Sequence, residues 1–87
     1  MSEPLPVTLY RRDGCGLCDR AEAELARIAR RLPIRVVPVD IAADAVLEAR
    51  YFLEIPVVEA AGRVVARAPI AAPALEAALR ELLSPGR

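Results

Sequence analysis

The stretch "RRDGCGLCDRAEAEL", residues 11–25, contains both cysteines of an 87-residue chain. Cys15 and Cys18 stand three positions apart, where a turn gives way to a helical pattern. Residues at i and i+3 lie on the same face of a helix, so the two sulfurs can close a disulfide with little backbone movement. Gly14 and Gly16 let the backbone turn tightly and leave Cys15 sterically open.

The place of Cys15 at the start of a helix favours its thiolate. Unpaired backbone N–H groups and the positive end of the helix dipole meet there. Cysteines in such positions have pKa values of roughly 3.5 to 7.5, against about 8.5 unperturbed. Arg11 and Arg12, as exposed side chains before the turn, are expected to add a screened positive potential. The arrangement suits attack by Cys15 on a disulfide, followed by attack of Cys18 on the mixed disulfide.

Other roles for the cysteine pair are open at this point. A structural disulfide across two intervening residues would close a very short loop and stabilise little. A zinc site needs four ligands, which a chain with two cysteines and no histidine cannot supply in the usual set. A metal or iron–sulfur centre shared between two chains is a further alternative. Redox chemistry without a resident metal is the leading hypothesis.

The overall composition gives no indication of binding to nucleic acid or to membranes. Basic and acidic residues balance at 12 each, so we expect no nucleic-acid partner and no anionic membrane surface as partner. Residues 1–6 lack the features of a signal peptide, and no run approaches the ~20 apolar residues of a membrane span. We therefore expect a cytoplasmic protein, in which a close cysteine pair is catalytic or metal-binding rather than structural.

The first half of the chain predicts a strand, a helix and a second strand. Residues 7–10 are rich in β-branched and aromatic side chains, which is typical of a strand. Apolar residues then recur every three or four positions and predict a helix that ends before Pro33. Residues 34–40 predict a second strand, which Pro38 places at a sheet edge because proline cannot donate a ladder hydrogen bond. The predicted apolar face of the helix is Leu17, Ala21, Leu25, Ile28 and Leu32.

The second half predicts a short helix, a hairpin and a last helix. Residues 44–52 predict the short helix, with Val46, Leu47 and Arg50 spaced for one turn of contact. Two strand-like runs, 57–60 and 64–68, predict a β-hairpin with Gly62 at its tip.

Leucines at helical spacing predict the last helix, which ends at Ser84-Pro85-Gly86. Pro69 and Pro73 are expected to break the chain before it. The resulting order is β-α-β-α-β-β-α. The first β-α-β unit requires a parallel strand pair with a right-handed crossover, and the hairpin supplies an antiparallel half. We expect an α/β fold, a four-stranded mixed sheet flanked by helices, in one domain over residues 1–87.

The order of elements, with "CGLC" opening the first helix and "EIPVV" at residues 54–58 leading into the hairpin, resembles the thioredoxin fold in its smallest form. More closely, it resembles the glutaredoxin-like thiol-disulfide proteins, over nearly the whole chain. A C-x-x-C motif near a β-α-β pattern is moderately specific, and Ile55-Pro56 strengthens it. The resemblance implies a thiol-disulfide oxidoreductase in which Cys15 is the nucleophile and Cys18 resolves. It also implies roles in electron transport and cell redox homeostasis, on disulfide-containing proteins or small-molecule disulfides.

The resemblance assigns a role to Pro56. In the family the proline before the third strand is cis and faces the cysteines. Pro56 would present the backbone of Ile55 to an extended substrate segment. Because proline has no backbone N–H, it would also offer no donor that could form an unwanted hydrogen bond to the sulfurs. A trans proline that starts a strand is the alternative. Ile55, Pro56, Gly14 and Arg12 are the expected substrate-binding residues.

Two departures leave the branch of the superfamily open. The cysteines enclose Gly-Leu, where glutaredoxins have Pro-Tyr or Pro-Phe and thioredoxins have Gly-Pro. After the hairpin, glutaredoxins carry a glycine pair and an acidic residue that help hold glutathione, whereas this chain has "ARAPIAAPALEAA" at 66–78. We expect no bound cofactor, with glutathione or a thioredoxin reductase as reductant. A non-catalytic redox sensor or binding domain is the alternative, since fold does not settle function.

Overall fold

Four strands form one mixed sheet in the spatial order β2-β1-β3-β4 within residues 3–84, the part of the chain that this computed structural model describes. The strands are β1 (Leu5–Arg11), β2 (Ile34–Asp40), β3 (Val57–Ala60) and β4 (Arg63–Arg67). The helices are α1 (Gly16–Ile28), α2 (Ala45–Tyr51) and α3 (Ala72–Leu83), with a short 3-10 turn, η1, at Ile41–Ala43. The predicted order β-α-β-α-β-β-α is confirmed, apart from the unforeseen η1.

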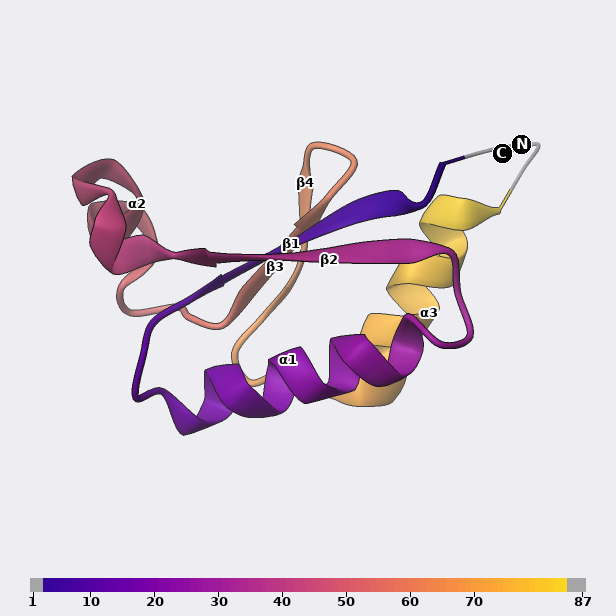
Figure 1. Ribbon diagram of the computed structural model, residues 1–87, viewed down its shortest axis with the longest axis horizontal. Coiled ribbons are helices and arrows are strands. Elements are labelled where there is room, and N and C mark those ends of the chain that lie inside the picture. Colours follow the sequence, from indigo (N-terminus) through magenta and orange to yellow (C-terminus); the bar gives the residue numbers. More distant parts are fainter. Residues whose placement is uncertain (1–2, 85–87) are drawn as a thin grey trace.

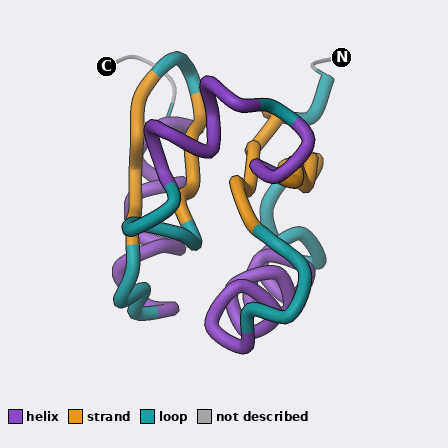
Figure 2. Tube along the Cα trace, turned by 90° about the vertical axis from the view of Figure 1, so that its left-hand side faces the viewer, coloured by secondary structure: helices purple, strands orange, loops and turns teal. Residues whose placement is uncertain are grey.

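The helices cover the sheet from two sides. Figure 1 shows α1 and α3 on one side of the sheet and α2 on the other. Figure 2, seen from the end where α1 begins, shows α2 at the top, α1 at the lower right and α3 along the left, behind the strands of the hairpin. β1 lies in the middle, parallel to β2 and antiparallel to β3. β2 is an edge strand, as Pro38 predicted.

The buried face of α1 differs from the predicted one at its first residue. Leu17 is 55% exposed, whereas Cys18 is fully buried together with Ala21, Leu25 and Ile28. Both Leu17 and Cys18 have helical spacing to Ala21, at four and three residues, so periodicity alone does not choose between them. Tertiary packing selects Cys18, and Leu17 is left at the surface between the two cysteines.

The α1 helix also ends earlier than predicted, at Ile28. The chain continues as a tight turn in which the N–H groups of Arg31 and Leu32 both donate to the carbonyl of Ile28, at 2.9 and 2.8 Å. Because a residue before proline avoids the α conformation, Pro33 shortens the regular helix. Leu32 is nevertheless buried, so its predicted contribution to the core is correct.

The α2 helix begins at a side-chain cap. The carboxylate of Asp44 accepts the N–H groups of Val46 and Leu47, at 2.9 and 3.2 Å. The predicted contact residue Val46 is wrong, since it is 73% exposed. Tyr51 is buried instead and stacks on Tyr10, with ring centroids 4.7 Å apart. The guanidinium of Arg50 lies 5.8 Å from the centre of the Tyr51 ring.

The hairpin has a two-residue connection. Ala61 and Gly62 both have positive φ, at 53° and 75°, which is the arrangement of a type I′ turn. Gly62 lies at the tip as predicted. β4 begins at Arg63 and ends at Arg67, one residue earlier at both ends than the predicted run 64–68.

The α3 helix includes one of the prolines expected to break the chain. Pro73 lies in the first turn, where a missing N–H leaves no intrahelical bond unmade. Ala71 is the N-cap residue and provides no side-chain hydrogen bond. The helix ends at Leu83 with Ser84 as its C-cap, so the rest of the predicted stop, residues 85–86, lies outside the described residues.

The main core lies between the sheet and the two longer helices. β3 has a buried residue on each face, because Val58 packs into the main core and Val57 into a smaller cluster with Ile41 and Tyr51. Within residues 3–84 no helix has both the length and the apolar character needed to cross a membrane. The buried members of the main core are Val7, Leu9, Ala21, Leu25, Ile28, Leu32, Ile34, Val58, Ala60, Leu75 and Leu79.

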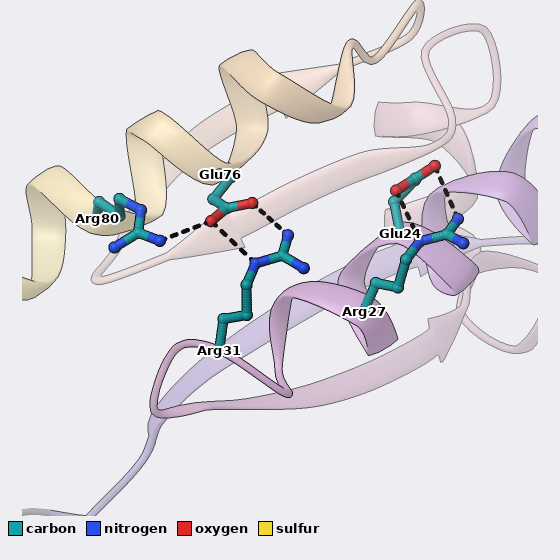
Figure 3. A network of polar contacts seen from close by, with 5 residues as sticks. All are labelled: Glu24, Arg27, Arg31, Glu76 and Arg80. Carbon is teal, nitrogen blue, oxygen red and sulfur yellow. Dashed lines mark hydrogen bonds and ion pairs between the residues drawn. The ribbon is translucent and has the colours of Figure 1, made fainter.

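An ion-pair network joins α3 to the turn that follows α1 at the surface. Arg31 and Arg80 both bind the carboxylate of Glu76, at 2.5 and 2.9 Å, as Figure 3 shows. Hydrogen bonds from Arg31 and then Arg80 lower the pKa of Glu76, and the bond to Glu76 raises the pKa of Arg31. A separate pair within α1 joins Glu24 to Arg27 at 2.9 Å.

Candidate redox site

The two cysteines form a disulfide at the start of α1, with their Cα atoms 5.2 Å apart. The approach from β1 passes through Gly14, whose φ of 78° lies in the left-handed region that favours glycine. Gly16 is the first helical residue, and a Cβ built there would meet nothing within 4 Å. Gly14 therefore makes the turn, as the sequence predicted, and the effect of Gly16 on access to Cys15 stays a prediction.

Cys15 is the N-cap residue of α1, and its sulfur is the capping atom. The backbone N–H of Cys18 donates to this sulfur at 3.1 Å, and the N–H of Asp19 donates to the Cys15 carbonyl at 3.0 Å. Cys15 is partly exposed, whereas Cys18 is fully buried. A hydrogen bond and a helix N-terminus both favour negative charge on an attached atom. One sulfur is thus accessible and capped by an amide, and the other is enclosed.

The two arginines before the turn do not act as the exposed charges that the sequence suggested. Arg11 is only 14% exposed and donates to Asp19 at 2.8 Å and to Glu22 at 2.7 Å. Its bond to Asp19 chiefly raises the pKa of Arg11. Arg12 pairs with Glu48 of α2. Because each guanidinium faces a carboxylate, both positive charges are paired, and their effect on the potential at Cys15 stays a prediction. The role of Arg12 in substrate binding stays a prediction.

The peptide bond between Ile55 and Pro56 is cis, as the resemblance implied. Pro56 is fully buried and Ile55 is half-buried. The N–H of Ile55 donates to the carbonyl of Tyr51 at 3.1 Å, which ties this segment to the end of α2. A second cis bond, Ala68-Pro69, follows β4 and was not foreseen.

A cavity of about 370 Å³ begins at Leu17, the residue between the two cysteines, although neither cysteine lines it, and we call it the site groove. It connects the first turns of α1 with Pro56 and with the segment that enters α3, so both cis prolines line it. Sequence reasoning missed this groove, although a leucine between the two cysteines was a signal for it. The lining residues are Leu17, Arg20, Ala21, Glu24, Pro56, Ala68, Pro69, Ile70 and Ala72.

The nearby tyrosines belong to the core rather than to the site. The hydroxyl of Tyr10 donates to Glu59 at 2.8 Å, and burial, followed by this bond, raises the pKa of Tyr10 to about 12. Glu54, just before the cis proline, pairs with Arg67 at 3.0 Å. Within the described residues 3–84, no group of three or more histidine, cysteine, aspartate or glutamate side chains is placed to hold a metal ion.

A parallel β-α-β half that carries the cysteine pair, followed by an antiparallel half that opens on a cis proline, defines the thioredoxin fold. Residues 6–81 match the family described as Glutaredoxin-like domain (DUF836), and the chain belongs to this family. A search of curated proteins found no match.

Solved structures agree with this assignment. The protein XcR50 from X. campestris is 39% identical, with a TM-score of 0.75, and the match covers 86% of this chain and 96% of that one. Ne2328 from Nitrosomonas europaea has a TM-score of 0.75 at 22% identity, covering 88% and 93% of the two chains. Thioredoxin 1 from Thermosipho africanus has a TM-score of 0.68 at 14% identity, covering 90% and 93%. The last two show a shared fold. Together with the close cysteine pair, family and fold support a thiol redox role.

Proposed function

We propose that this protein is a thiol-disulfide oxidoreductase in which Cys15 is the nucleophile and Cys18 the resolving cysteine. The observation that carries the proposal is the asymmetry of the pair. Cys15 is partly exposed and its sulfur accepts a helix N–H, whereas Cys18 is fully buried one turn along. An outer thiol that is held as a thiolate attacks first, and an inner thiol can reach only what has become attached to the outer one.

The proposed cycle has two exchange steps. The Cys15 thiolate attacks one sulfur of a substrate disulfide, so that a mixed disulfide forms while the other substrate sulfur leaves as a thiolate and takes up a proton. The Cys18 thiol then loses its proton to water, and its sulfur attacks the Cys15 sulfur. The second substrate thiolate leaves and is protonated. The substrate disulfide has gained two electrons and two protons, and the Cys15–Cys18 disulfide has formed.

The wider setting is part of the proposal. The substrate is a disulfide-containing protein or a small-molecule disulfide, and glutathione or a thioredoxin reductase returns the disulfide to the dithiol. The protein takes part in cytoplasmic electron transport and redox homeostasis, with no bound cofactor. Oxidised protein incubated with each reductant in turn, followed by thiol counting, identifies the electron donor.

Variants of each cysteine test the mechanism. Reduced Cys18→Ser protein should accumulate a mixed disulfide with a substrate such as hydroxyethyl disulfide, visible as a mass increase that dithiothreitol removes. Cys15→Ser protein should remain unmodified over the same time, because its remaining sulfur is buried. Turnover of the disulfide by wild-type protein supports the enzyme. Reversible oxidation without turnover would make the protein a redox sensor instead.

The reactivity of Cys15 is a second test. Reduced wild-type protein should react with iodoacetamide near pH 6–7 faster than free cysteine does, because only the thiolate reacts. A rate equal to that of free cysteine would remove the argument that the helix start activates this sulfur.

A further inference from the structure

The site groove has walls that are mostly apolar and come from three parts of the chain. Leu17 lies between the two cysteines in the sequence, lines the groove and is 55% exposed. Pro56 contributes from the start of the hairpin, and Pro69 and Ile70 from the segment before α3. An exposed leucine beside a reactive sulfur is an apolar contact left for a substrate to complete.

The charged residues of the groove differ in what they bind. Glu24 is occupied by Arg27, which donates two hydrogen bonds to its carboxylate. Arg20 makes no hydrogen bond or ion pair with any residue in the described range 3–84. The groove therefore carries one uncompensated positive charge, and a substrate carboxylate would complement it.

The wall opposite α1 lacks polar side chains. Residues 68–72 are alanine, proline and isoleucine only, so no side chain there can donate or accept a hydrogen bond. Glutathione is a small tripeptide with two carboxylates and one ammonium group, so most of what it offers a site is charge rather than apolar surface. Arg20 supplies one partner, and Glu24 is already paired. A longer segment with apolar side chains uses these walls better.

We infer that the site groove binds an extended protein segment that carries an apolar and an acidic residue next to the substrate cysteine, in preference to glutathione. This inference rests on the oxidoreductase function proposed above and names the substrate class of that site. The apolar side chain packs between Leu17 and Ile70, and the carboxylate pairs with Arg20. The substrate cysteine is then held against Cys15.

A matched set of mixed disulfides tests the inference. Each probe is a thiol coupled to thionitrobenzoate, whose coloured release by reduced protein gives a second-order rate constant. The thiols are short cysteine peptides flanked by Leu and Asp, by Leu and Lys, or by Ser and Asp, together with glutathione and mercaptoethanol. The Leu-Asp peptide should react about tenfold faster than glutathione and the Ser-Asp peptide, the usual scale for filling an apolar pocket.

Two variants locate the preference. Arg20→Glu should invert the ratio of the rate constants for the Leu-Asp and Leu-Lys peptides. Arg30 is an exposed arginine just beyond α1, and Arg30→Glu should leave that ratio unchanged. Ile70→Ser should reduce the ratio of the rate constants for the Leu-Asp and Ser-Asp peptides. Val46 on α2 is exposed, and Val46→Ser is the control that should leave this ratio unchanged. Each readout is a ratio of two rate constants measured on the same variant. A general loss of activity lowers both rate constants and leaves the ratio unchanged.

The possible failures are distinguishable. If the mercaptoethanol probe reacts while glutathione matches or exceeds the Leu-Asp peptide, the groove assignment is overturned and the oxidoreductase function stands. Unchanged peptide ratios in Arg20→Glu and Ile70→Ser overturn the assignment in the same way. If the mercaptoethanol probe itself is not reduced, the proposed function fails and the inference fails with it.

Discussion

At the scale of single residues, the backbone angle of Gly14 sets how the chain reaches Cys15. Its φ of 78° is accessible to glycine at no cost, whereas an L side chain there costs about 1–2 kcal/mol. No atom lies within 4 Å of an added Cβ at Gly14, so this cost is purely conformational. The turn that leads to Cys15 thus depends on one residue without a side chain.

Gly14→Ala should therefore lower the free energy of unfolding by about 1–2 kcal/mol, measured by urea denaturation of the oxidised protein. Gly16→Ala is the matched control, because it adds the same methyl group to open space at a helical position. There, alanine should stabilise by up to about 1 kcal/mol. Equal effects of the two substitutions would show that the left-handed turn is not the reason for Gly14.

Tyr10 provides a spectroscopic prediction. In a Tyr51→Phe variant it is the last of the chain's two tyrosines, and its ultraviolet titration should have a midpoint clearly above the ordinary value of about 10, but below that of the wild type, because Tyr51 is one of the smaller causes of the raised pKa. Adding Glu59→Gln should lower this midpoint, because the bond and the charge of Glu59 both raise the pKa of Tyr10 while burial remains. A midpoint at the ordinary value of about 10 in the folded variant would contradict the buried hydrogen bond.

The raised pKa of Tyr10 also predicts how the stability of the protein changes at alkaline pH. The folded state holds the Tyr10 proton more tightly than the unfolded chain does. Its contribution to stability is complete below about pH 10 and is lost as the pH rises towards 12. Tyr10→Phe should flatten this part of the stability profile.

At the scale of elements, Glu76 couples α3 to Arg31 in the turn that follows α1. Glu76→Gln should lower Tm at neutral pH by about 1–4 °C, as befits exposed ion pairs. Because the pKa of Glu76 is lowered in the folded state, this contribution is present above about pH 4.3 and is lost as the pH falls through the lowered value. The difference between variant and wild type should therefore shrink in acid.

Glu24→Gln is the control, since its pair with Arg27 lies within one helix and joins no second element. Its effect on Tm should be smaller than that of Glu76→Gln. A Glu76→Gln difference that stays constant from neutral pH to about pH 3 would contradict the ion-pair explanation.

Substitutions at the two helix N-caps should change the stability of the protein in opposite directions. Asp44→Ala removes an acceptor for two N–H groups at the start of α2 and should cost about 1 kcal/mol. Ala71→Ser adds a capping side chain at the start of α3, which has none, and should stabilise by about 0.5–1 kcal/mol. Thermal unfolding of both variants checks the pair. A loss of stability in Ala71→Ser would mean that its hydroxyl does not reach the helix amides.

The elements could be predicted from the sequence because each depends on local spacing. Pro38 marked an edge strand, and Gly62 marked a hairpin tip. The errors occurred where tertiary packing chooses between equivalent positions. Leu17 and Cys18 fit the same helical face, and only the packed structure shows that Cys18 is inside. Val46 was likewise expected to make contact and is exposed.

The site was predictable in its chemistry and less so in its surroundings. The cysteine pair and the proline before β3 are local motifs. The charges around them cannot be read from neighbouring residues in the sequence. The carboxylate that pairs with Arg12 belongs to Glu48 of α2, 36 residues further along the chain. The far wall of the groove was also hidden, since residues 68–72 are apolar and have no chemical signature.

At the scale of the whole molecule, stability depends on the core between the sheet and the two longer helices. Leu25 is fully buried there. Leu25→Ala should lower the free energy of unfolding by about 2–5 kcal/mol, a large share of what a domain of this size has. Val46→Ala, at an exposed apolar position, should change it by less than about 0.5 kcal/mol. Urea unfolding of both variants measures the contrast, and similar losses would contradict the observed core.

Both free edges of the sheet carry features that discourage its growth. The outer strand β2 has exposed Arg35 and Pro38, and β4 begins and ends with the exposed residues Arg63 and Arg67. Proline interrupts the row of donors that an incoming strand needs, and arginines repel a second copy of themselves. Crowded chains are thereby kept from aggregating edge to edge into cross-β ladders. Such borders limit the sheet to its own four strands.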